Sequence, residues 1–105
     1  RVSVALAGAL PPPGPCGKPA ELTVAITNQG FVTSQLEAAF VGEAPAGATL
    51  DFHPAPLKGA PHELRTLRIT LAHPGATDLT IAFHARNEAP DLGERDRVHF
   101  LIRCL

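Results

Sequence analysis

Residues 79–85 read Leu-Thr-Ile-Ala-Phe-His-Ala, and residues 98–104 read Val-His-Phe-Leu-Ile-Arg-Cys. In both stretches an apolar side chain occupies every second position. Because successive side chains of a β-strand point to opposite faces, this period of two predicts two strands that are each buried on one face. A helix would instead need apolar residues three and four positions apart. These two stretches therefore decide the fold class.

The same alternation occurs in five further runs, at 1–6, 22–27, 36–40, 50–52 and 67–71. Turn signals separate the runs: Pro74-Gly75 is one, and the prolines between Pro11 and Pro15 cannot donate to a strand ladder. About seven short strands with turns between them are typical of an all-β, immunoglobulin-like antiparallel β-sandwich. We therefore expect this fold.

The composition narrows the function. The chain has 105 residues, of which 45% are hydrophobic and 18% charged, with a net charge of -1. It starts at Arg1 and contains no Met, so residues 1–105 are expected to be a single domain excised from a longer protein. The small net charge gives no electrostatic reason to bind nucleic acid. No apolar run approaches the roughly 18 residues of a transmembrane segment.

A domain of this size can hold one core but not a large active-site cleft as well. The nucleophile candidate is Cys104 beside His99 or His53, but Cys104 falls on the inward face of the last predicted strand. We therefore expect a non-enzymatic module without a cofactor.

The last two strands can be paired through a hairpin centred between Asp91 and Leu92. In that register Phe83 faces Phe100 and Ile81 faces Ile102, so the apolar sets of both strands point inward together. On the outer face the same register places His84 opposite His99.

Two cross-strand histidines suggest an alternative function. Their Cβ atoms would lie roughly 5 Å apart, which allows His84 and His99 to share a zinc or copper ion. A third ligand could come from His53 or His62, in the predicted loop between the fourth and fifth strands. A periplasmic metal-handling domain is the alternative to an interaction module, and two surface histidines without a metal are the simpler interpretation.

Two surfaces are candidates for contact with a protein partner. The polar loop 87–96 could be a recognition loop, because sandwiches present loops at their ends on a rigid scaffold. The other is the last strand, where apolar side chains fall on the outward face and an added strand could pair by β-augmentation. The candidate binding residues are Glu88, Asp91, Leu92, Glu94, Leu101 and Leu105.

The segment Gly17-Lys-Pro-Ala-Glu-Leu-Thr-Val-Ala-Ile-Thr-Asn-Gln-Gly30 is similar to bacterial immunoglobulin-like modules, in particular the cell-adhesion-related domain found in bacteria. The alternating stretches at 67–71 and 79–83, with Pro74-Gly75 between them, resemble the later strands of such modules. The chain has no Trp or Tyr, so it lacks the core tryptophan and tyrosine corner of antibody domains.

The resemblance implies a periplasmic or extracellular binding or scaffold domain attached to a larger protein. Its partner would be another protein or a neighbouring domain. In that topology the first and last strands lie side by side, which brings Cys16 near Cys104 and implies a disulfide; free thiols are the alternative. Closing this 88-residue span would stabilise the fold by roughly 4–5 kcal/mol on a chain-entropy basis.

Overall fold

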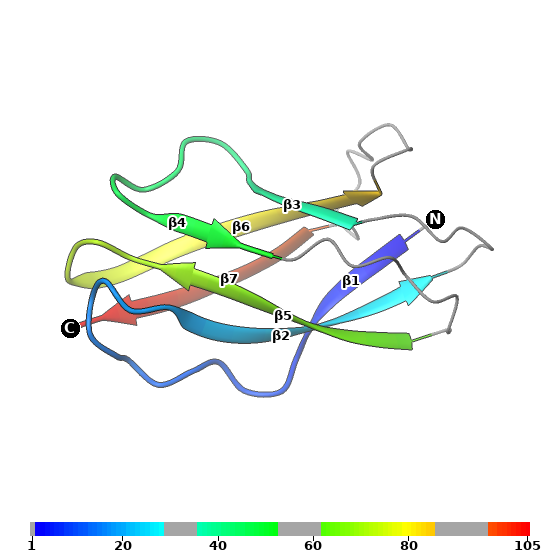
Figure 1. Cartoon of the computed structure of the whole chain (residues 1–105), viewed down its shortest axis with the longest axis horizontal. Helices are drawn as coiled ribbons and strands as arrows, with labels where there is room; N and C mark the ends of the chain where they lie inside the picture. The colour runs from blue at the N-terminus through cyan, green and yellow to red at the C-terminus, as the bar shows by residue number, and fades with distance from the viewer. Residues whose placement is uncertain (1, 29–35, 53–61, 86–96) are drawn as a thin grey trace.

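The computed structural model describes residues 2–28, 36–52, 62–85 and 97–105 (Figure 1). Every regular element in these ranges is a strand. The strands are β1 (Val2–Ala7), β2 (Ala20–Asn28), β3 (Leu36–Phe40), β4 (Thr49–Asp51), β5 (His62–Thr70), β6 (Gly75–Ala85) and β7 (Arg97–Cys104). All seven runs of alternating residues therefore form strands, as predicted.

The strands make two antiparallel sheets that pack as layers (Figure 1). The four-stranded sheet has the order β1-β2-β5-β4, and the three-stranded sheet has the order β3-β6-β7. β1 and β7 are therefore edge strands of opposite sheets. The predicted all-β sandwich is confirmed.

The core lies between the two sheets and is built from the inward residues of the alternation. Val24, Leu67 and Ile81 have no exposed surface. Burial of each such aliphatic side chain stabilises the fold by about 1.5–3 kcal/mol. Phe83 meets Phe52 edge-on, with ring centroids 5.3 Å apart, the geometry that aromatic quadrupoles favour.

The predicted register of the last hairpin is wrong. Phe100 lies opposite Leu79, not Phe83, and Val98 lies opposite Ile81. The strands are thus shifted by four residues from the prediction. An even shift keeps every inward side chain inward, so the alternation cannot distinguish the two registers. The observed one places Cys104 opposite Gly75, at the first residue of β6.

β5 begins earlier than the alternation indicated. Its first residue is His62, which therefore lies in a strand and not in the loop predicted there. The alternation was interrupted because Glu63 and Arg65 occupy the same face as Leu67 and Ile69. Glu63 is only 7% exposed, and its carboxylate accepts a hydrogen bond of 2.8 Å from the Arg65 guanidinium. This ion pair accounts for charged residues at inward positions.

Candidate interaction surface

Residues 8–19, which we call the proline strap, connect β1 to β2 by way of the opposite sheet. Gly8 has a φ of 75° and starts the strap directly after β1. The strap then runs toward the C-terminal end of β7 before the chain returns to β2 (Figure 1). It therefore bridges the edges of the two sheets.

The strap is fastened to the end of β7. The amide of Leu105 donates to the oxygen of Gly14 at 2.9 Å, and Gly14 forms a parallel bridge with Cys104. The sulfurs of Cys16 and Cys104 form a disulfide, with Cα atoms 4.9 Å apart. The disulfide implied by the resemblance is thus present in the structure.

The partner of the last strand differs from the expectation. β1 pairs with β2, from Val2 opposite Asn28 to Ala7 opposite Thr23. The strap, and not β1, makes the parallel contact with β7. The strap makes a bridge and not a longer ladder, because most of its residues next to Gly14 are prolines without an N–H group.

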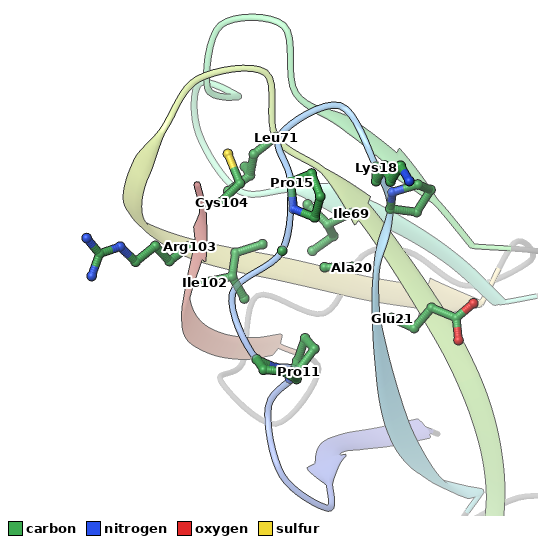
Figure 2. Close-up of a pocket in the computed structure, with 13 residues that line it drawn as sticks. Pro11, Pro15, Lys18, Ala20, Glu21, Ile69, Leu71, Ile102, Arg103 and Cys104 are labelled. Carbon is green, nitrogen blue, oxygen red and sulfur yellow. The ribbon is translucent and has the colours of Figure 1, made fainter.

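A pocket of about 150 Å³ lies under the strap (Figure 2). Its floor is apolar, and Ile69, Leu71 and Ile102 contribute from β5, the turn after it and β7. The remaining lining comes from the strap, the start of β2 and the end of β7: Pro11, Pro12, Gly14, Pro15, Lys18, Pro19, Ala20, Glu21, Arg103 and Cys104.

The edge of β7 from Arg97 to Leu101 has no backbone partner among the described residues, whereas Gly14 of the strap occupies the edge between Arg103 and Leu105. On its inner side β7 pairs with β6 along its whole length. The N–H of Leu105 and its oxygen both point to the strap side. Because backbone groups alternate along a strand, those of Arg97, His99, Leu101 and Arg103 point to that side as well. Their side chains lie on the outer face.

Leu101 and Leu105 are exposed as expected, at 56% and 69%. Leu10, in the strap, is 42% exposed. Leu64 is 64% exposed on the outer face of the other sheet. The exposed position of Leu64 was not predicted, although the alternation of Leu67 and Ile69, extended back to His62, places Leu64 on the outer face. The loop candidates Glu88, Asp91, Leu92 and Glu94 lie outside the described residues, as does His53.

The two candidate metal ligands are not cross-strand neighbours, which corrects the prediction. His99 faces Thr80, and His84 pairs with Glu37 of β3. His84 lies four residues farther along β6 than Thr80, which separates the histidines by roughly 13 Å. The shifted register is the cause.

Each histidine has a carboxylate partner. His84 Nε2 lies 3.4 Å from a carboxylate oxygen of Glu37, and His99 Nε2 contacts the carboxylate of Asp78. Within the described residues, no group of three or more His, Cys, Asp or Glu side chains could hold a metal ion.

The fold is similar to that of a CARDB domain. The crystal structure of the CARDB domain of the PF1109 protein from Pyrococcus furiosus, in complex with di-metal ions, shares 15% sequence identity with a TM-score of 0.53. The match covers 100% of this chain and 88% of that chain. The solution NMR structure of the same domain gives 15% identity, a TM-score of 0.52, and coverage of 99% and 94%. The resemblance to this domain is thus confirmed at the level of the fold.

No protein-family model matches the chain, and no curated protein matches its sequence. The part of the chain that the structure describes contains no helix long and apolar enough to cross a membrane.

Proposed function

We propose that this domain is a non-enzymatic interaction module of a bacterial periplasmic, extracellular or membrane-attached protein. It binds a protein partner or a neighbouring domain by adding a strand to the edge of β7. The observation that carries the proposal is the row of edge-facing backbone groups from Arg97 to Leu101, which pair with no described residue, beside the exposed side chain of Leu101. An extended segment gains main-chain hydrogen bonds from such an edge, and specificity from its side chains.

Two features support a location outside the cytoplasm. The Cys16–Cys104 disulfide suits an oxidising compartment. The shared fold with a domain whose family name refers to cell adhesion supports a role in contact between proteins. Both are consistent with a module that holds a rigid surface outside the cytoplasm.

The loop between β6 and β7 is a second proposed contact. Glu88, Asp91, Leu92 and Glu94 come directly before the N-terminal end of β7 in the sequence. A segment paired with β7 would therefore have one end next to the last residues of this stretch, whose side chains could extend the contact. Leu105 would serve the same purpose at the other end.

A metal-handling function is not proposed. The PF1109 domain was crystallised with di-metal ions, but His84 and His99 of this chain each pair with a carboxylate on a different part of the sheet. The two-histidine site therefore lacks the geometry on which it was based.

The test is a selection of random nine-residue peptides against the oxidised domain, with binding mapped by amide chemical shifts. We expect selected peptides to perturb the edge-facing amides of β7. The informative variant is Leu101→Pro, because the Leu101 N–H points away from β6 and its loss spares the β6–β7 ladder. The affinity of the selected peptides should fall about tenfold or more, because the variant loses one main-chain hydrogen bond and the proline changes the shape of the edge.

Leu101→Ala is the matched control, since it removes the side chain and keeps the donor. It separates the contribution of the apolar contact from that of the backbone. Peptides that bind tightly but perturb only residues outside β7 would overturn the proposed function.

A further inference from the structure

We infer that the proline strap carries a second interaction surface: its exposed prolines bind in a groove of a partner protein that is lined by aromatic side chains. This surface is separate from the edge of β7 and does not depend on strand addition there. It follows from the backbone conformation of residues 10–15, from which of these residues are exposed, and from the hydrogen-bond donors that prolines lack.

The strap is an extended segment between two glycines. Gly8 and Gly17 have φ angles of 75° and 85°, and no residue between them has a positive φ. The four prolines within residues 11–15 have φ fixed at about −65°, and a residue that precedes a proline is held in an extended conformation. The described part of the chain has no cis peptide bond. Residues 10–15 therefore favour a polyproline II helix, which has about three residues per turn and no internal hydrogen bonds.

Burial along this segment recurs at the third residue. Pro11 and Gly14 are half-buried and line the pocket together with Ile102 (Figure 2). Pro12 and Pro15 also border the pocket, but both are exposed. In a polyproline II helix, residues 11 and 14 belong to one row of side chains, and residues 12 and 15 belong to the next. The segment therefore rests on the domain with one row and presents the others to solvent.

The third row is exposed as well. It contains Leu10, which is 42% exposed, and Pro13. Together the two outward rows form an apolar surface, which we call the proline ridge: Leu10, Pro12, Pro13 and Pro15. Grooves lined with aromatic rings recognise polyproline II segments of this kind.

The C-terminal end of the proline ridge is fixed to the domain. The Gly14 oxygen accepts the 2.9 Å hydrogen bond from Leu105, and Cys16 is joined to Cys104. Because φ is also fixed at each proline, the segment loses little conformational freedom when a partner binds. The domain thus presents the ridge in a preformed conformation.

The backbone of the ridge accepts hydrogen bonds but has almost no donors. Prolines have no N–H, and within the described residues the carbonyl oxygens of residues 10–13 accept no backbone hydrogen bond. A partner must therefore supply donors together with apolar rings. Trp and Tyr supply both, because an indole carries an N–H and a phenol an O–H. We expect the groove to contain these two residue types.

A second copy of this chain cannot supply such a groove. The chain contains no Trp or Tyr. Among the phenylalanines that the structure describes, Phe83 and Phe100 are buried in the core, and Phe40 and Phe52 pack against it. The partner is therefore a different polypeptide.

The probe is a phage-displayed library of one WW domain, a fold that binds polyproline II segments in an aromatic-lined groove. Its loops are randomised and its groove keeps the aromatic residues, whereas a second library has alanine at those groove positions. Both libraries are selected against the oxidised domain, and binding is mapped by the carbon-bound proton shifts of the prolines. We expect only the aromatic library to yield domains that perturb the proline ridge. If it yields none, or if both libraries yield them equally, the inference is wrong.

Two variants of adjacent residues test the ridge by calorimetry. Pro12→Ala removes an exposed ring and should raise the Kd of the selected domains about fivefold or more, because two methylene groups leave the contact. Pro11→Ala interrupts the prolines in the same way but changes the row on the pocket, so Kd should stay within about twofold. Neither variant removes a backbone hydrogen bond, since proline donates none, and melting temperatures check the fold. Equal losses of affinity would show a response to chain stiffness alone and would overturn the inference.

Leu101→Pro separates this surface from the edge of β7. The selected WW domains should bind that variant with unchanged Kd, whereas peptides selected for the β7 edge should bind it more weakly. If Leu101→Pro abolishes binding of the WW domains, they occupy the edge and the proline ridge is not a second site. Failure of strand addition at β7 leaves the expected results for the ridge unchanged.

Discussion

The oxygen of Gly14 accepts a hydrogen bond of 2.9 Å from the amide of Leu105, one residue beyond the end of β7. This bond and the disulfide of Cys16 close the C-terminal end of the β7 edge. The prolines at 11–13 cannot extend the pairing toward Arg97, because they have no N–H to donate. The strap therefore pairs with the C-terminal end of β7, and no described residue pairs with the edge from Arg97 to Leu101.

Removing the disulfide should destabilise the domain strongly. In the double variant Cys16→Ser/Cys104→Ser, the unfolded chain regains the freedom of an 88-residue span. The free energy of unfolding should fall by about 3–5 kcal/mol in guanidinium titrations. The native protein in a reducing agent is the control and should lose a similar amount. Equal stability of oxidised and reduced protein would contradict the prediction.

Two glycines should respond differently to alanine. Gly47 has a φ of 73°, and a Cβ there would lie 2.7 Å from the Cβ of Ala72. Gly47→Ala should cost about 1–3 kcal/mol, since it adds backbone strain and a clash. Gly14→Ala is the matched control, because nothing lies within 4 Å of its Cβ position and its φ is not positive. Similar melting temperatures for the two variants would show that the loop at Gly47 adapts.

Two arginines of β5 should contribute unequally to stability. Arg65 points inward and pairs with Glu63, whose side chain is 6% exposed. Arg65→Ala should cost about 3 kcal/mol, because a buried carboxylate loses a charged partner. Arg68 pairs with exposed Glu21 on the outer face. Arg68→Ala should therefore lower the free energy of unfolding by only about 0–1 kcal/mol. Chemical denaturation of both variants measures the difference, and equal losses would refute it.

Zinc should not bind between His84 and His99. The register separates them by roughly 13 Å along the sheet, far beyond the span of one ion. Calorimetric titration of the native protein and of His84→Ala should give the same result. One tightly bound zinc that disappears in both His84→Ala and His99→Ala would contradict the observed register.

The alternation predicted which residues face the core because that pattern depends on each strand alone. Leu79, Ile81, Val98 and Phe100 are all buried as expected. It could not predict which of them meet, since shifts of two or four residues preserve the inward faces. The register is consistent instead with distant constraints, among them the bond between Cys104 and Cys16 in the strap.

The candidate site was predictable in part for the same reason. The outward positions of Leu101 and Leu105 follow from the alternation of β7, and both side chains are exposed. Which part of the β7 edge is left without a partner does not follow from the alternation, because it depends on where the strap crosses between the sheets. The predicted pairing of His84 with His99 was wrong because it depended on the predicted register of β6 and β7. The inward ion pair of Glu63 and Arg65 was missed because charged residues at core positions break the pattern.

The disulfide also sets how the domain would respond to mechanical force. Tension applied to the two ends of the chain would pass from Leu105 to Cys104, through the disulfide to Cys16, and along the strap into β1. Residues 17–103 would carry no load along the backbone. Only the first 15 or so residues could lengthen, as β1 peels from β2, to about 50 Å in place of the roughly 360 Å of the whole extended chain. In a series of such domains, each domain could extend only by this short length before the disulfide prevented further unfolding. The edge of β7 would keep its structure under load.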